Sequence, residues 1–222
     1  MILVPYQVDT LSTRRPVANM VIVAITAIIS IMAMGGSLSD STTEAMVLDG
    51  WGLAGLFGHM LLHQGLMHLI GNMLMLWIFG NAIAGIMTQF EFALVYLGTG
   101  LLAAATQVIF DGQPTVGASG AVAGVMGVYL AVYPTNTVTC FWMWFVRVGT
   151  FDISGWLLII GYFALDLLGM LGRGDNVAHW AHVGGTVAGF TIGLAMLKIG
   201  RFDLQSYDHP TALDYFGGSR RD

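Results

Sequence analysis

The amino-acid sequence predicts an all-α membrane protein, a bundle in which the chain crosses the bilayer six times. Of its 222 residues 56% are hydrophobic and only 9% are charged, whereas a soluble domain has roughly 25% charged residues. The hydrophobic residues form runs close to the roughly 20 residues that a helix needs to cross a bilayer. The chain also has 30 glycines, which let membrane helices approach each other closely. These observations exclude the soluble classes of protein.

The six predicted spans follow from the positions of the apolar runs. In chain order they run from about Val17 to Met34, Leu66 to Ile86, Phe92 to Phe110, Gly117 to just before Pro134, Phe151 to Leu171, and Val177 to Ile199. We therefore divide the chain into an N-terminal segment (1–16), a six-helix membrane domain (17–200) and a short polar tail (201–222). We expect the tail to be frayed. The first run is too long for a cleavable signal peptide.

The basic residues predict how the spans are oriented. With six spans, both termini lie on the same side of the membrane as the loops after the second and fourth spans. Seven of the eight Lys and Arg residues fall on that side, and only Arg173 falls on the other. Because cytoplasmic loops of membrane proteins are enriched in Lys and Arg, we expect both termini to be cytoplasmic.

Two segments between the spans are too apolar for ordinary loops. Residues 35–65 form a long first outer loop, which carries Trp51 and several Leu and Met residues, and we expect it to lie in the membrane interface. Residues 134–150, with Trp142 and Trp144, suggest a second interfacial segment, because Trp is enriched at that depth. The chain shows no internal repeat, which weighs against an inverted-repeat transporter.

Other classes of function are excluded by charge and cysteine content. The net charge is −5, and nucleic-acid binding requires a basic patch that the sequence lacks. The single cysteine, Cys140, excludes an internal disulfide framework and any thiolate metal cluster. We therefore expect the partners of this chain to be the lipid bilayer and other membrane proteins rather than nucleic acid.

The polar residues inside the spans are the candidates for function, because such residues are costly in a bilayer. His68 and Asn72 lie four residues apart in the second span and therefore share one face of the helix. They project an imidazole and a carboxamide into the same space. Two interhelical hydrogen bonds would be the simpler use of this pair.

Ser119 lies in the sequence Gly-Ala-Ser-Gly, directly after a loop that breaks the helix. That position is the first turn of a helix, where backbone N–H groups lack partners and negative charge is favoured. A serine there can attack a carbonyl while the amides of Ala118 and Ser119 point at the developing oxyanion. The alternative is packing alone, because Gly120 and Gly124 form a close-approach motif.

His182 is followed by Gly185 and Gly189 on the sixth span. These glycines allow the span to approach another helix, and if that helix is the fourth span, His182 comes within reach of Ser119. A structural hydrogen bond is the alternative role for this histidine. Together the serine, the histidine and the His/Asn pair are the components of acyl-transfer chemistry.

These three motifs together resemble the rhomboid family of intramembrane serine proteases. They are H-x-x-x-N at His68, G-x-S-G at Ser119 and A-H-x-x-G at His182, and they occur in the family's order over about residues 10 to 200. The resemblance implies a Ser119 nucleophile and a His182 general base, acting as a dyad without a third acid, a metal or another cofactor. It also implies an oxyanion hole of His68, Asn72 and the Ser119 amide, to which we add the Ala118 amide.

The resemblance further implies the substrate and the membrane. The substrate is expected to be a single-span protein that is cut near the outer boundary of the membrane, at small side chains in a helix that unwinds easily. The bare six-span form resembles bacterial members, which indicates a cell (inner) membrane. The sequence indicates neither the oligomeric state nor the particular substrate.

Three positions depart from the family pattern. Ala54 and Gly55 stand where many members have Trp-Arg in the first outer loop. Ala123 stands where members often have Tyr or Phe, on which the catalytic histidine stacks, so His182 is expected to be oriented by something else, or less well. Asp166 lies deep in the fifth span, and without an evident partner we expect it to be held neutral by burial, or in a polar contact, rather than to act in catalysis.

Three other classes of function are weaker alternatives. His59 and His63 have the i, i+4 spacing of zinc ligands, but Met60 replaces the Glu of a metalloprotease motif. Residues 172–175 read Gly-Arg-Gly-Asp and match the G-x-G-D of aspartyl intramembrane proteases. They fall in a short outer loop instead of a span, which makes the match a coincidence. A catalytically inactive rhomboid-like protein that binds membrane clients is the third alternative, although such proteins usually lack the serine or the histidine.

Overall fold

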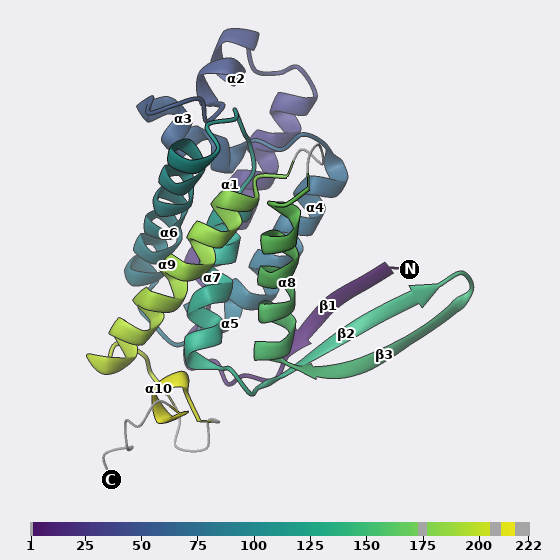
Figure 1. The fold of residues 1–222 in the computed structure, drawn as a ribbon, viewed down its shortest axis with the longest axis vertical. Coiled ribbons are helices and arrows are strands. Elements are labelled where there is room, and N and C mark those ends of the chain that lie inside the picture. The colour runs from purple at the N-terminus through teal and green to yellow at the C-terminus, as the bar shows by residue number, and fades with distance from the viewer. Residues whose placement is uncertain (1, 173–176, 205–209, 216–222) are drawn as a thin grey trace.

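A computed structural model of the chain describes residues 2–172, 177–204 and 210–215. Within these residues most of the chain is helical (Figure 1). Four helical segments are long and apolar enough to cross a membrane, namely Val17–Met34, Leu66–Ala84, Gln89–Phe110 and His179–Lys198. Two shorter apolar helices, Ser119–Val132 and Gly155–Gly169, occupy the places of the other two predicted spans.

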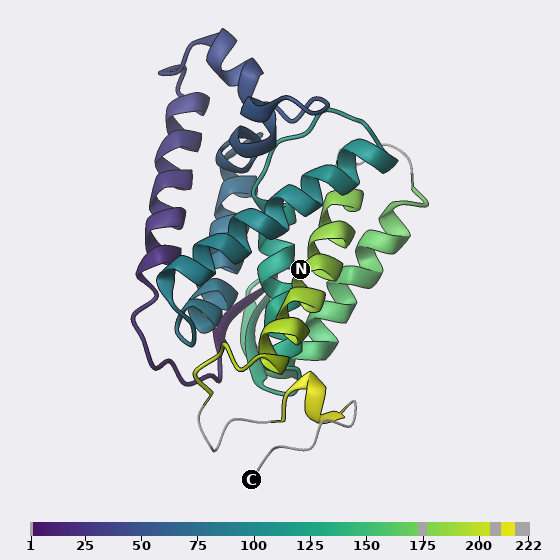
Figure 2. The same ribbon diagram turned by 90° about the vertical axis from the view of Figure 1, so that its left-hand side faces the viewer.

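The helices agree closely with the predicted spans in position. They are α1 (Val17–Met34), α4 (Leu66–Met75) continued by a π-helical turn η2 (Leu76–Gly80) and α5 (Asn81–Ala84), α6 (Gln89–Phe110), α7 (Ser119–Val132), α8 (Gly155–Gly169) and α9 (His179–Lys198). The bounds of α1 match the prediction. Helix α1 lies at one edge of the bundle and α8 at the opposite edge (Figure 2).

Helix α7 forms the centre of the bundle. Twelve of its 14 residues are buried, and it packs against α6 and α9 (Figure 1). The contact with α9 joins backbone to backbone, because a Cβ atom placed on Gly185 or Gly189 would overlap the carbonyl of Gly120 or Gly124. The predicted approach of the fourth and sixth spans is therefore confirmed.

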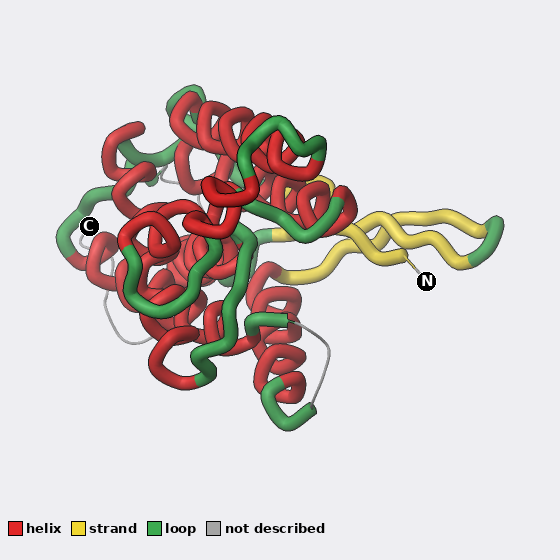
Figure 3. The backbone as a smooth tube through the Cα atoms, turned by 90° about the horizontal axis from the view of Figure 1, so that it is seen from above, coloured by secondary structure: helices red, strands yellow, loops and turns green. Residues whose placement is uncertain are grey.

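The all-α prediction is wrong in one respect, because the described chain contains a three-stranded antiparallel sheet. Its strands are β1 (Ile2–Val8), β2 (Thr137–Trp144) and β3 (Arg147–Ser154), in the order β1-β2-β3. The sheet projects sideways from the helices (Figure 3). Most of the segment predicted to be interfacial (134–150) belongs to the β2–β3 hairpin, because its β-branched and aromatic residues favour strands. The fifth helix consequently begins at Gly155 instead of Phe151.

The prediction of a frayed tail is wrong for the part of the tail that the structure describes. Asp203 forms an ion pair with Arg14 at 2.6 Å, and its amide donates to the carbonyl of Ile86 at 2.7 Å. The short helix α10 (Ala212–Tyr215) follows, with Thr211 and Ala212 buried. These contacts join the start of α1, the loop after α5 and the end of α9 at one end of the bundle.

The first outer loop folds into α2 (Asp40–Met46), α3 (Leu53–Gly58) and a 3-10 turn η1 (His59–Leu61) at the other end (Figure 1). Gly55 packs where a Cβ atom would overlap the carbonyl of Val47. Leu48 pairs with Thr115 through two backbone hydrogen bonds of 3.0 Å, and the carbonyl of His59 accepts from Gly117 at 2.8 Å. The loop therefore holds in place the segment that leads into Ser119.

Candidate active site

Ser119 and His182 meet at the N-terminal ends of α7 and α9. Ser119 is the first residue of α7, as predicted. Its Oγ atom lies 2.7 Å from Nε2 of His182, within hydrogen-bond distance. The side chains converge because the glycines of α9 lie against the backbone of α7 one turn further along. The two residues that the sequence could only suggest as neighbours are in contact.

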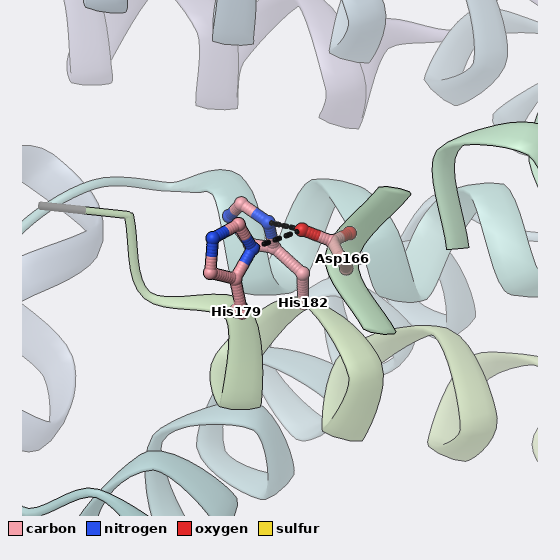
Figure 4. Close-up of side chains that lie close together, drawn as sticks. All are labelled: Asp166, His179 and His182. Atoms are coloured by element: carbon pink, nitrogen blue, oxygen red, sulfur yellow. Dashed lines mark hydrogen bonds and ion pairs between the residues drawn. The ribbon is translucent and has the colours of Figure 1, made fainter. Parts of the chain in front are cut away.

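Asp166 binds the other nitrogen of the same imidazole. Its Oδ1 atom lies 2.8 Å from Nδ1 of His182 and also 2.8 Å from Nδ1 of His179. Figure 4 shows both rings, from α9, approaching one carboxylate oxygen, from α8. A polar contact was one of the two expectations for Asp166, and its partners, which the sequence did not identify, are these two histidines.

This contact fixes the direction of the hydrogen bonds. An ionised carboxylate can only accept, so His182 donates from Nδ1 and keeps a lone pair on Nε2. That lone pair faces the hydroxyl of Ser119, which donates to it. The serine, the histidine and the acid thus form a chain of contacts of the kind that can activate a nucleophile. The expected dyad without a third acid differs from this geometry.

His68 lies beside the serine, and Asn72 lines the same cavity. The ring of His68 covers Gly117, where a Cβ atom would come within 3.0 Å of Nε2 of His68 and 3.6 Å of the Ser119 Oγ. Gly117 has φ of +134°, a conformation that other residues rarely adopt. Asn72 donates one amide hydrogen to the carbonyl of His68 at 3.0 Å. Its second amide hydrogen can be donated to a group bound in the cavity.

The Ala118 amide departs from the predicted oxyanion hole. Its N–H donates to Nε2 of His63 at 3.4 Å, and Nδ1 of His63 donates to the hydroxyl of Ser30 at 2.9 Å. Burial lowers the pKa of His63 to about 4, and the nearby His68 lowers it too, so the ring stays neutral and accepts this bond at pH 7. The donors left for an oxyanion are His68, Asn72 and the amide of Ser119, which as the first helical residue has no acceptor within its helix.

A cavity of about 700 Å³ opens over these residues. Helices α4, α7, α8 and α9 line it, and Ser119, Asn72 and Asp166 all face it. The cavity continues along α4 and α8 as far as Val4 and Pro5 of β1. Ser119 is therefore accessible from this cavity.

Comparison with known proteins agrees with this geometry. Residues 50–199, which include Ser119, His182 and Asp166 as well as His68 and Asn72, match the rhomboid domain. This chain belongs to the rhomboid family. Rhomboid protease GluP of Bacillus subtilis (strain 168) is 31% identical over 144 residues, which cover 64% of this chain and 26% of that protein.

Mitochondrial relatives align over the same part of the chain. The mouse presenilin-associated rhomboid-like protein, mitochondrial, is 31% identical over 132 residues, covering 57% of this rhomboid and 34% of the relative. Rhomboid protein 1, mitochondrial, of Saccharomyces cerevisiae is 26% identical over 145 residues, covering 61% and 40%. The matched region thus spans about a quarter to two fifths of these relatives.

The departures from the family pattern have structural counterparts in this rhomboid. Ala123 lines the cavity near His182 and offers no ring on which that histidine could stack. Asp166 holds His182 instead, through its Nδ1 atom. Gly55, in place of an anchoring Trp-Arg, allows the close contact of α3 with the backbone of Val47.

The metalloprotease alternative has no support in the first outer loop. Nδ1 of His59 bonds the carbonyl of Gly55 at 2.8 Å, whereas His63 bonds Ser30 and the Ala118 amide. The two rings thus have separate structural partners instead of sharing a metal. Of the Gly-Arg-Gly-Asp match, Arg173, Gly174 and Asp175 lie outside the described residues.

Proposed function

We propose that this chain is an intramembrane serine endopeptidase in which Ser119 is the nucleophile and His182 the general base. The observation that carries the proposal is the 2.7 Å contact between Ser119 Oγ and His182 Nε2, beside a cavity between apolar helices. Membership of the rhomboid family and the likeness to rhomboid protease GluP support it.

The reaction follows from the positions of the donors and acceptors. Nε2 of His182 removes the proton of Ser119 as Oγ attacks the peptide carbonyl, and Asp166 stabilises the imidazolium that forms. Asp166 is therefore a positioning residue, which acts through the histidine. The carbonyl oxygen gains negative charge and accepts from His68, Asn72 and the Ser119 amide. His182 then protonates the leaving amine, and water hydrolyses the acyl-enzyme.

The substrate we propose is a single-span membrane protein, cut near the outer boundary of the membrane. Ser119 lies at the end of α7 that adjoins the first outer loop. Arg14 and Arg201, just before α1 and just after α9, lie at the opposite end of the bundle. If the positive-inside rule holds for this chain, the serine is near the outer surface and both termini are cytoplasmic. The two short helices α7 and α8 then complete a six-span bundle in a cell (inner) membrane.

Cleavage of a single-span reporter by the purified protein tests the proposal. Wild type is compared with Ser119→Ala and His182→Ala, and we expect cleavage only by wild type. Thermal melting of the three proteins shows whether the variants remain folded. If the Ser119→Ala protein cleaves as fast as wild type, the assignment of the nucleophile is wrong. If folded wild type binds several reporters and cuts none, the protein is an inactive client-binding relative.

A further inference from the structure

Three metal-ligating atoms converge next to the proposed catalytic serine. Within the described residues, Asp166, His179 and His182 each offer one ligand atom, and these three atoms lie within 4.8 Å of one another. Oδ1 of Asp166 is 2.8 Å from Nδ1 of each histidine. The histidines are three residues apart and share one face of α9, while the acid comes from α8 (Figure 4). Two imidazoles and one carboxylate are a ligand set used by Zn²⁺ and other divalent transition metals.

We propose that Asp166, His179 and His182 bind a divalent transition-metal ion of the Zn²⁺ class, and that the bound ion switches the protease off. Binding of the ion concerns only these three side chains. The inhibitory part of the proposal rests on the proposed function, because it requires that His182 be the base for Ser119.

The cluster is close to the dimensions of a zinc site. Zinc lies about 2.0–2.2 Å from nitrogen and oxygen ligands, so ligand atoms around a tetrahedral ion are about 3.3 Å apart. The two Nδ1 atoms now lie 2.8 Å from the carboxylate oxygen. An increase of roughly half an ångström in each of these two nitrogen–oxygen distances would open the space for an ion.

The surroundings favour binding from solvent. The three side chains are 13–19% exposed. Asp166 and His182 line the main cavity, and His179 lines a second one of about 430 Å³. Water from these cavities can supply the fourth ligand. Gly169 makes the arrangement possible, because a Cβ atom there would overlap the ring of His179 and push it away from Asp166.

A bound metal ion would prevent His182 from acting as the base for Ser119, although every residue is still present. Before an ion can bind, Nδ1 of His182 and Nδ1 of His179 must each lose the proton that they donate to Asp166. On each ring this proton moves to Nε2, so both imidazoles stay neutral and offer an Nδ1 lone pair to the ion. Nε2 of His182 then donates to Ser119 Oγ instead of accepting its proton. The serine can no longer be deprotonated, whereas the cavity that receives the substrate is unchanged. Inhibition therefore lowers kcat and leaves KM nearly unaltered.

Cobalt binding to the full chain tests the site without any need for protease activity. The Ser119→Ala protein is titrated with Co²⁺, whose visible absorption reports tetrahedral coordination, and Zn²⁺ is then added as a competitor. We expect one equivalent of Co²⁺ to bind and Zn²⁺ to displace it. His179→Gln and Asp166→Asn, each in the Ser119→Ala background, should weaken binding by about 10–100-fold or more. Asp111→Asn, at the wall of the second cavity, is the matched control and should bind as before.

Inhibition of cleavage tests the switch. We expect Zn²⁺ to inhibit the wild-type protein and a chelator to restore cleavage. In His179→Gln, the concentration giving half inhibition, relative to that variant's own metal-free rate, should rise at least about tenfold.

The outcomes separate the two proposals. Absence of Co²⁺ binding, or equal binding by His179→Gln, overturns the metal site even if the wild-type protein cleaves its reporter. Equal inhibition of wild type and His179→Gln overturns the switch. Co²⁺ binding by a protein that cleaves nothing leaves the metal site standing and overturns the proposed function.

Discussion

Replacing Asp166 by Asn tests whether this carboxylate positions the catalytic base. The change keeps the size of the side chain but removes the negative charge beside Nδ1 of His182. It also allows an amide N–H to donate to that nitrogen. A ring that accepts at Nδ1 carries its proton on Nε2, where the proton prevents removal of the Ser119 hydrogen.

The expected loss can be worked out from the contact. Oδ1 of Asp166 lies 2.8 Å from Nδ1 of His182, so the charge centres of carboxylate and imidazolium are about 4 Å apart. At an effective dielectric constant of about 20, they attract by about 4 kcal/mol. Losing this attraction in the transition state lowers kcat about 10³-fold. The corresponding change in a serine protease with a catalytic triad costs about 10⁴-fold.

The assay is steady-state cleavage of the single-span reporter by wild type and Asp166→Asn. Asp152→Asn, on the exposed strand β3, is the matched control and should behave as wild type. Because Asp166 acts on the chemical step, kcat should fall while KM and the melting temperature stay near their wild-type values. A kcat within about threefold of wild type would show that His182 needs no acid. The Ser119–His182 dyad that the rhomboid resemblance implies would then be correct.

Three further predictions concern other parts of the site and fold. Asn72→Ala should lower kcat by about 10²–10³ because one oxyanion donor is lost, as measured with the same reporter. Gly189→Ala should destabilise the bundle by about 1–3 kcal/mol, because its Cβ would overlap the Gly124 carbonyl, whereas Gly161→Ala, in open space, should leave the melting temperature unchanged. Burial lowers the pKa of His63 to about 4 from 6.5, so the folded state binds fewer protons than the unfolded state between these values and stability is lost as the pH falls from about 6.5 to 4. Unfolding at pH 7 and pH 4.5 should show this loss in wild type and less of it in His63→Gln.

The parts of the fold set by local composition could be predicted from the sequence. The apolar run of α1 gave the bounds Val17–Met34 because the length of a span and its flanking residues are both local features. The strand β1 could not be predicted in the same way, since its partner β2 lies more than a hundred residues further along the chain. Aromatic residues of β2 satisfied the pattern of an interfacial segment equally well.

The site was predictable in its residues but not in its contacts. The spacing of the glycines on α9 was enough to suggest that His182 meets Ser119. Nothing in one helix, however, reports how α8 is rotated against α9, and that rotation decides what Asp166 touches. A usable signal was present, because His179 and His182 are three residues apart and so face the same neighbour. The direction of the Ala118 N–H depends on the local backbone conformation, which the identities of the side chains do not determine.

The small side chain of Ala123 and the carboxylate of Asp166 suggest that two different kinds of side chain can support the catalytic histidine. In the rhomboid family an aromatic ring at the position of Ala123 often supports the catalytic histidine from its face. In this chain the support comes from Asp166, at the ring nitrogen. If the aromatic ring and the carboxylate both orient His182, a ring introduced at position 123 should change kcat little while Asp166 is present. It should change kcat more when Asp166 is replaced.

A double-mutant cycle measures this exchange. Ala123→Tyr alone should change kcat by less than about threefold, since the side chain lines an open cavity and His182 is already held. In the Asp166→Asn background the same change should recover about tenfold of the lost kcat, because stacking restores the orientation of the ring but not the missing charge. Reactivity of Ser119 towards a fluorophosphonate, measured beside cleavage, separates activation of the serine from obstruction of the cavity by the new side chain. Equal effects of Ala123→Tyr in both backgrounds would mean that Asp166 does not take over the role of the aromatic residue.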